Sequence, residues 1–199
     1  MQVEDLVRQM RRSHLIAVIR ALSSVEAQAK AERALAAGVE VLEIAWTTPN
    51  SDDVIRSLQQ EAAIVGAGTV LTAEAAERAI NAGAEFLFAP NFSREVLALT
   101  QSRQVVYIPG VLTPRDVADA IAAGLTLLKL FPAASGGISH FKALREPFPG
   151  LEWIPTGGVT WDTIDQWLDH GAVGVGMGSA LFDHADLAGA VNHLRNARQ

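Results

Sequence analysis

The chain of 199 residues contains no cysteine, which excludes disulfide bonds, thiolate metal sites and catalysis by a thiol. No uncharged apolar stretch approaches the length of a membrane span, and the charged amino-terminal segment lacks the apolar core of a signal peptide. Runs of basic residues are also missing, and the net charge of -6 argues against nucleic-acid binding. We therefore expect a cytoplasmic protein with no membrane or nucleic-acid partner.

Hydrophobic residues make up 49% of the chain and charged residues only 19%. This balance is typical of a folded domain with a large core and not of a disordered chain. No Ser/Pro-rich linker or block of charge divides the sequence. We therefore predict a single domain over residues 1–199.

A short motif recurs along the chain, in which a glycine ends a helix-like stretch and begins an apolar strand. It occurs at Gly38, Gly83, Gly124 and Gly171, and glycine is the expected left-handed cap just past a helix. Four further apolar runs lie between these strands, at Leu15–Ile19, Ala62–Gly66, Val105–Ile108 and Glu152–Pro155.

The runs give eight strands that alternate with helical patterns such as Ser24–Ala37 and Thr113–Ala123. This alternation predicts an α/β protein with a parallel sheet, and eight units predict a closed (β/α)8 TIM barrel. Residues Met1–Arg12 predict an extra N-terminal helix that covers the bottom of the barrel. A flat doubly wound sheet is the alternative, but it gives no reason for eight units.

Lysine is scarce, with three residues against thirteen arginines, yet Lys129 lies inside the apolar run Leu125–Pro132. Burial opposes the charge of an ammonium group, and a lysine in an apolar pocket becomes a nucleophile for carbonyl carbons. Lys129 is therefore the first candidate for catalysis. The alternative is a lysine whose stem lies along apolar surface while its head reaches water.

The repeat also sets a register, because Glu43, Phe88, Lys129 and Gly176 each stand five residues after a repeat glycine. They should form one inward-facing layer from alternate strands. Their neighbours should point outward against the helices; these are Leu42, Ile44, Leu87, Leu128 and Leu130. Glu43 and Lys129 would then face each other across the barrel, as a catalytic pair or as a structural salt bridge. Buried ion pairs are weak devices for stability, which favours catalysis.

Barrel enzymes place their active sites at the carboxyl ends of the strands. Here the loops after the last two strands, Thr156-Gly157-Gly158 and Gly178-Ser179, are rich in glycine. Glycine lets backbone N–H groups approach an anion closely, and a following helix N-terminus favours it, so we predict a phosphate site. The alternative is a tight strand-to-helix turn. The histidines show no metal-ligand spacing, so we expect no metal.

Taken together, the segments at the strand ends resemble the 2-dehydro-3-deoxy-6-phosphogluconate (KDPG) and 4-hydroxy-2-oxoglutarate (KHG) aldolases. The resemblance rests on Leu42–Ile44, Gly66–Thr72, Pro109–Pro114, Leu128–Pro132, Pro155–Val159 and Gly178–Ser179, and it spans Leu15 to Phe182. It implies a class I aldolase on a (β/α)8 barrel, commonly a homotrimer, that needs no metal or other cofactor. The implied substrate is a phosphorylated 2-keto acid, cleaved to pyruvate and glyceraldehyde 3-phosphate.

Carried over by position, the resemblance makes Lys129 the Schiff-base lysine and Glu43 the acid/base. The substrate-binding residues would be Thr69, Pro109, Phe131 and Thr156, to which we add Arg20 because it lies at the mouth of the first strand. The phosphate-binding residues would be Gly157, Gly158, Gly178 and Ser179. From the residues alone, Thr69 could instead cap the next helix, although Thr72 fits that role better.

The chain departs from the family pattern at two places. Many members have an arginine four residues after the glutamate, and this chain has Thr47 there. Many members also have Ser-Pro-Gly after the fourth strand, and this chain has Ala89-Pro90-Asn91 there. Arg20, after the first strand, is the natural substitute for binding a carboxylate, since a guanidinium pairs with it bidentately; otherwise it is an ordinary rim residue. Alternative functions are aldolases for the galactonate epimer or for 4-hydroxy-2-oxoglutarate, a phosphate-binding barrel isomerase or synthase, and a non-catalytic barrel.

Overall fold

A computed structural model describes residues 1–198 of the chain. The strands are β1 (Leu15–Ile19), β2 (Val41–Ala45), β3 (Ile64–Gly68), β4 (Phe86–Phe88), β5 (Val106–Ile108), β6 (Gly110–Val111), β7 (Leu127–Leu130), β8 (Glu152–Pro155) and β9 (Val175–Met177). The helices are α1 (Val3–Ser13), α2 (Ser24–Ala36), α3 (Ser51–Ser57), α4 (Ala73–Asn81), α5 (Arg94–Arg103), α6 (Pro114–Ala122), η1 (Ala133–Ser135), α7 (Gly137–Arg145), α8 (Ile164–Asp169), α9 (Ser179–Phe182) and α10 (Leu187–Asn196). None of the helices within residues 1–198 has the length and apolar character needed to cross a membrane.

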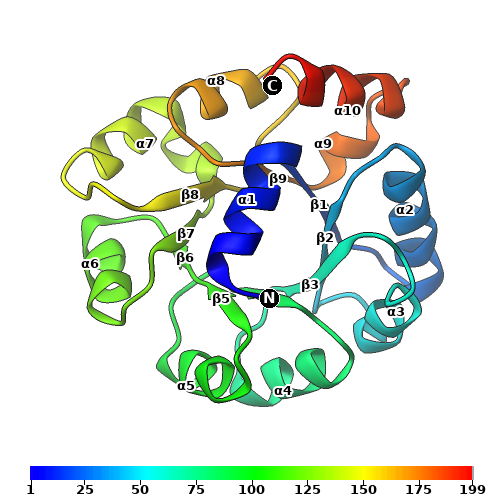
Figure 1. The fold of residues 1–199 in the computed structure, drawn as a ribbon, viewed down its shortest axis with the longest axis horizontal. Helices are drawn as coiled ribbons and strands as arrows, with labels where there is room; N and C mark the ends of the chain where they lie inside the picture. Colours follow the sequence, from blue (N-terminus) through cyan, green and yellow to red (C-terminus); the bar gives the residue numbers. More distant parts are fainter. Residues whose placement is uncertain (199) are drawn as a thin grey trace.

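Every strand pairs with its neighbours in parallel. One sheet has the order β5-β4-β3-β2-β1-β9 and the other β6-β7-β8. Pro109 alone separates β5 from β6, and a bridge between Thr156 and Gly176 joins the end of β8 to β9. Figure 1 shows the strands curled around a common centre with helices outside them. The predicted α/β class with a curled parallel sheet is confirmed, and this arrangement is consistent with the predicted barrel.

Two strand predictions differ from the structure in a way that bears on the site. The third strand runs from Ile64 to Gly68, two residues later than predicted, so both of its glycines lie inside the sheet. The fifth predicted strand, Val105–Ile108, is found as β5, but pairing resumes after Pro109 as β6, a short strand that was not predicted; Pro109 itself has no N–H to give to a ladder. The carbonyl of Pro109 still accepts a hydrogen bond from Lys129 N at 3.0 Å.

The core has two layers, as the alternation along the strands predicts. Side chains that point into the ring form one cluster, which includes Ile16, Val41, Phe86, Ile108 and Ile154. Those that point outward pack with the helices; Leu42, Ile44, Leu87, Leu128 and Leu130 are all in this outer cluster. Residues two apart on a strand therefore face the interior together, which confirms the predicted register.

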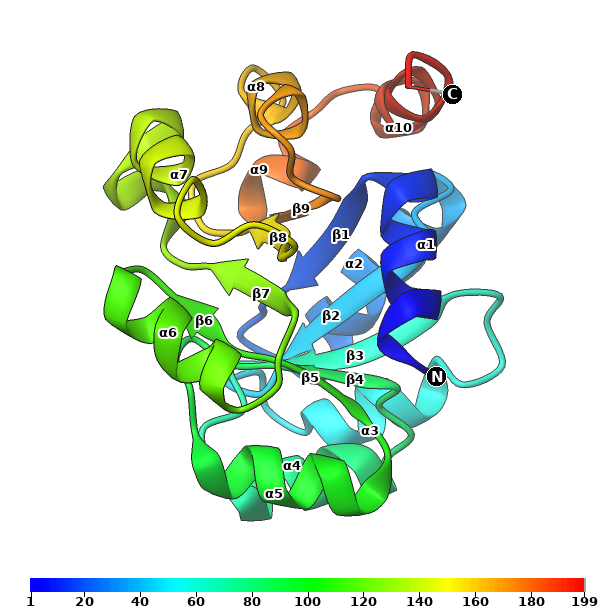
Figure 2. The same cartoon turned by 60° about the vertical axis from the view of Figure 1, so that its left-hand side comes forward.

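Helix α1 completes the inner cluster with Leu6 and Met10, both fully buried. Figure 1 shows α1 across the centre of the ring, and Figure 2 shows it on one side of the strands. It covers that opening with apolar side chains, so the opposite, carboxyl end of the strands is the end left for a site.

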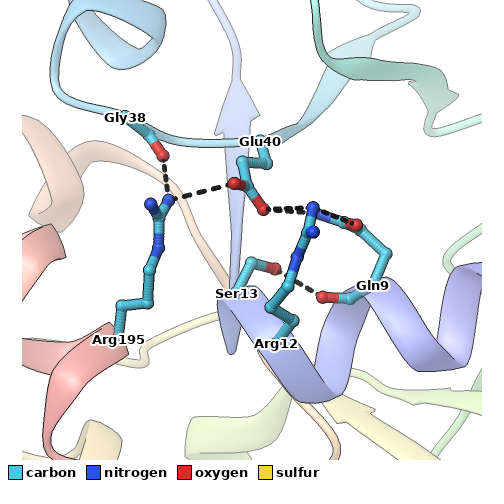
Figure 3. A network of polar contacts seen from close by, with 6 residues as sticks. All are labelled: Gln9, Arg12, Ser13, Gly38, Glu40 and Arg195. Carbon is cyan, nitrogen blue, oxygen red and sulfur yellow. Dashed lines mark hydrogen bonds and ion pairs between the residues drawn. The ribbon is translucent and has the colours of Figure 1, made fainter. Parts of the chain in front are cut away.

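A polar network around Glu40, just before β2, ties α1 and α10 to the strand (Figure 3). Its carboxylate accepts hydrogen bonds from the Gln9 side chain and from Arg12 Nη2, the latter at 3.2 Å. Arg195 Nη2 lies 3.3 Å from the other carboxylate oxygen and donates to Gly38 O at 2.6 Å. Helices α1 and α10 are thus held at the amino side of the strands, away from the candidate site.

Candidate active site

Lys129 on β7 and Glu43 on β2 meet inside the ring of strands, as the register predicts. Lys129 Nζ lies 3.2 Å from Glu43 Oε1 and 3.4 Å from Oε2. The two side chains are only 5% and 1% exposed. They are separated by 86 residues in sequence, so the parallel sheet alone brings them together.

The strands make room for this pair with small residues and surround it with aromatic rings. Gly68 lies beside Glu43, and a Cβ on Gly68 would come within 1.8 Å of Glu43 Oε1. The ring centroids of Phe88 and Phe131 lie 4.6 Å and 5.3 Å from Lys129 Nζ. An amine in this setting is desolvated and held in a fixed orientation, and Schiff-base chemistry needs such an environment.

A cavity of about 390 Å³ opens onto the pair at the carboxyl ends of the strands. Ten of the eleven predicted site residues line it: Arg20, Glu43, Thr69, Lys129, Phe131, Thr156, Gly157, Gly158, Gly178 and Ser179. Pro109 does not line the cavity and contacts Lys129 through its backbone carbonyl. Five lining residues were not predicted as site residues: Val18, Pro90, Val159, Thr160 and Ala180. Two of them had a sequence signal, since Pro90 lies in a segment that departs from the family pattern and Val159 in a segment that carries the resemblance.

Arg20 lies at the rim of this cavity and not on the outer surface of the barrel. Its Nη1 donates to Thr47 Oγ1 at 2.6 Å, and its Nη2 donates to Thr69 Oγ1 at 3.1 Å. Thr69 has a φ of +59°, a conformation that is strained for a β-branched residue. The guanidinium is therefore hydrogen-bonded to Thr47, the position where many family members have their arginine, and to the strained Thr69 of the cavity wall.

The glycine-rich loops line the other side of the cavity. Gly157 and Gly158 have φ values of +89° and +86°, and a Cβ on Gly158 would meet Ala134 Cβ at 2.4 Å. This loop can hold only glycine at these positions without strain. Helix α8 begins only at Ile164, so the loop and not a helix N-terminus faces the cavity there, whereas α9 begins at Ser179, directly after Gly178.

The arrangement combines an amine, a carboxyl group within hydrogen-bonding distance, a guanidinium at the rim and a glycine-rich wall. An amine and a carboxyl group around one small cavity suit addition to a carbonyl carbon followed by proton transfer. The guanidinium and the glycine loops suit a substrate with an anionic group at each end. Within residues 1–198, no group of three or more His, Asp or Glu side chains could hold a metal ion.

Comparison with known proteins agrees with this chemistry. Residues 6–193 match the model of the KDPG and KHG aldolase family. A probable 2-dehydro-3-deoxy-6-phosphogalactonate aldolase of Rhizobium meliloti is 35% identical over 187 residues, covering 89% of this chain and 85% of the relative.

Two crystal structures of aldolases are also similar to this chain. The Zymomonas mobilis 2-keto-3-deoxy-6-phosphogluconate aldolase with 3-phosphoglycerate superimposes with a TM-score of 0.85 at 28% identity, covering 100% of this chain and 95% of that one. The KDPG aldolase of Legionella pneumophila, with pyruvate captured as a covalent carbinolamine intermediate, gives a TM-score of 0.80 at 29% identity, covering 97% of each chain.

Proposed function

We propose that this carbon–carbon lyase works through a Schiff base on Lys129, since the chain belongs to the KDPG and KHG aldolase family. The observation that carries the proposal is the buried contact of 3.2 Å between Lys129 Nζ and Glu43 Oε1 beneath the cavity. The substrate would be a phosphorylated 2-keto-3-deoxy acid, and the products pyruvate and an aldehyde phosphate. The pyruvate carbinolamine of the Legionella relative supports the same chemistry here.

The first half of the reaction builds an electron sink on the substrate. Lys129 attacks the C2 ketone as the free amine and forms a carbinolamine. The carbinolamine takes up one proton from solvent, loses water and becomes an iminium ion, and this proton is released again when the iminium of pyruvate is hydrolysed. As the C3–C4 bond breaks, its electron pair moves to the iminium and forms an enamine. Glu43 removes the proton of the C4 hydroxyl, directly or through a water, so that C4 leaves as an aldehyde.

The second half returns the enzyme to its starting state. Glu43, now protonated, or its water gives a proton to C3 of the enamine and forms the iminium of pyruvate. Water adds to this iminium, pyruvate leaves, and Lys129 is free again. One carboxyl group therefore serves as base and then as acid, and the short distance between Glu43 and Lys129 suits both steps.

The remaining cavity residues would bind the two ends of the substrate. Arg20 would pair with the carboxylate, and Thr69 and Thr156 would contact the pyruvyl part, with Phe131 and Pro109 beside Lys129. The phosphate-binding group would be Gly157, Gly158, Gly178 and Ser179. Binding at the phosphate would orient the reacting bond over the amine.

For the sugar itself we propose KDPG, which gives glyceraldehyde 3-phosphate, as the primary substrate. The galactonate epimer is the second candidate, since Thr47 departs from the arginine of many family members and the Rhizobium relative is named for that epimer. 4-Hydroxy-2-oxoglutarate, which has no phosphate, is the third. Cleavage rates with the three compounds, measured side by side, separate these candidates.

We also propose that residues 1–199 form a single (β/α)8 barrel with α1 as an extra N-terminal helix. The joining of β8 to β9 through Thr156 and Gly176 supports closure of the barrel. A homotrimer in the cytoplasm is the assembly and location we infer from the family resemblance. Light scattering would test the assembly, with a mass about three times the 21.2 kDa of the chain expected for a trimer.

The central experiment is reduction with borohydride in the presence of pyruvate, followed by mass spectrometry and peptide mapping. We expect one reduced adduct on Lys129, and no adduct or cleavage with Lys129→Ala. Lys142→Ala, on the outer helix α7, is the matched control and should behave like the wild type. An adduct that persists in Lys129→Ala contradicts the assignment. No adduct on the wild type favours an isomerase or synthase, and an adduct without cleavage of any candidate favours a non-catalytic barrel.

A further inference from the structure

Side chains from α2 and from the loop after β2 hold the backbone that follows β1. Lys30 Nζ donates to Arg20 O at 3.1 Å, and Ala21 N donates to the buried Thr48 Oγ1 at 3.2 Å. Leu22 N donates to Glu26 Oε2 at 3.0 Å. Three successive backbone groups of the segment that carries Arg20 are thus bound by side chains.

The contacts of Lys30 and Glu26 form one unit on the first turns of α2. Lys30 Nζ lies 2.7 Å from Glu26 Oε1, while Glu26 Oε2 accepts the Leu22 N–H. The hydrogen bond from Lys30, joined by that from Leu22 N, lowers the pKa of Glu26. The Glu26 carboxylate therefore stays charged at neutral pH, and the unit bridges the carbonyl of Arg20 to the amide of Leu22.

Stability alone does not account for this unit. The side chains of Lys30 and Glu26 are 32% and 42% exposed, and exposed ion pairs contribute little to folding free energy. The backbone that they bind, by contrast, sets where the guanidinium of Arg20 begins its reach toward Thr47 and Thr69. A long side chain reaches a substrate atom reproducibly only when its backbone is fixed.

We infer that Lys30 is a positioning residue for Arg20 and acts on substrate binding through the Arg20 backbone carbonyl. This inference rests on the proposed role of Arg20 in binding the substrate carboxylate. Lys30 itself touches no part of the cavity, because it lies outside the residues that line it. Its effect should therefore fall on carboxylate affinity and leave the chemistry at Lys129 unchanged.

Pyruvate is the probe for this test, since it carries the carboxylate and the ketone without the sugar. We expect Lys30→Met to raise the pyruvate concentration for half-maximal borohydride trapping about three- to tenfold and to leave the saturating rate within about twofold. Lys30→Arg, which keeps a donor and the charge, should recover part of the affinity. Lys142→Met is the matched control and should leave both values unchanged. Methyl pyruvate has no carboxylate charge, so its trapping should not respond to Lys30→Met.

A double-mutant cycle with Arg20→Met separates the inference from the proposed function on which it rests. We expect Arg20→Met to raise the half-maximal pyruvate concentration more than Lys30→Met does, and Lys30→Met to add nothing in the Arg20→Met background. If Arg20→Met has no effect, the carboxylate role of Arg20 is wrong and the inference falls with it. If Arg20→Met raises the half-maximal pyruvate concentration but Lys30→Met does not, Arg20 keeps its role and Lys30 has none. The same holds if Lys30→Met raises this concentration equally with and without Arg20→Met. Loss of affinity for methyl pyruvate in Lys30→Met would also overturn the inference.

Discussion

Gly68→Ala should separate catalysis from stability, because the added methyl group would fall on the Glu43 carboxylate. The new Cβ would lie 1.8 Å from Oε1 and 2.5 Å from Cδ of Glu43. Restoring an ordinary contact of about 3.4 Å requires the oxygen to move by about 1.6 Å, and Cγ of Glu43, 2.6 Å from the new Cβ, to move by about 0.8 Å. The backbone at Gly68 lies outside the left-handed region, so alanine brings no strain of its own.

A displacement of this size is small for folding but large for proton transfer. The end of a glutamate side chain can rotate into the cavity, whereas an error of about 1 Å in a catalytic group can cost about a hundredfold in rate. Loss of general acid–base catalysis altogether costs about 10²- to 10⁴-fold. We therefore expect kcat for cleavage to fall at least about a hundredfold, while pyruvate still forms an adduct on Lys129.

The assay compares cleavage rate, borohydride trapping and thermal unfolding for two neighbouring substitutions. Gly66→Ala, two residues earlier on β3, would place its Cβ 2.5 Å from the Phe86 ring in the core. We expect Gly66→Ala to lower Tm with a modest change in the activity of the folded protein. Gly68→Ala should instead lower kcat strongly with a modest change in Tm. Cleavage by Gly68→Ala at the wild-type rate would refute the role of Glu43 as acid and base.

Three further predictions concern stability and binding. Burial raises the pKa of Tyr107, the single tyrosine, to about 12, so its tyrosinate absorbance should appear well above pH 10. The free energy of unfolding that this shift contributes is fully present below pH 10 and is lost as pH rises toward 12. Tyr107→Phe should not show this loss. Glu40→Gln should weaken the contacts with Arg12 and Arg195 and cost about 1 kcal/mol, a fall in Tm of about 2–4 °C by calorimetry, with kcat unchanged. Ser179→Ala should raise KM for the phosphorylated substrate several-fold and leave pyruvate trapping as it is; a change in trapping would place Ser179 outside the phosphate site.

The sequence was sufficient to predict the parts of the structure that depend on periodicity. The glycine repeat placed Glu43 and Lys129 at the same height on alternate strands, and alternation along each strand then determined which side chains face inward. These predictions needed no knowledge of how the loops run. They are correct because a parallel sheet leaves little freedom once its register is set.

Features that depend on loop geometry could not be predicted in the same way. The bonds from Arg20 to Thr47 and Thr69 join residues 27 and 49 positions apart, and no local pattern encodes them. Pro109 lies at a predicted strand end, yet the strand resumes after it as β6, its carbonyl accepts a hydrogen bond from Lys129 N, and it does not line the cavity. The late start of α8 at Ile164 likewise follows from the turn after Val159, which periodicity does not reveal.

The packing around Glu43 and Lys129 bears on whether this pair is structural or catalytic. A structural ion pair is most easily kept by filling the space around it, since buried charges gain only from close partners. Here the sheet gives up side-chain volume instead, because Gly68 leaves room for the Glu43 carboxylate and Gly176 leaves room for the Thr156 hydroxyl, each within 2.5 Å of a would-be Cβ. The two side chains that take up this space, Glu43 and Thr156, both line a cavity of about 390 Å³. An open space beside a desolvated amine lowers packing stability and serves a ligand, so the cost in packing itself favours the catalytic interpretation.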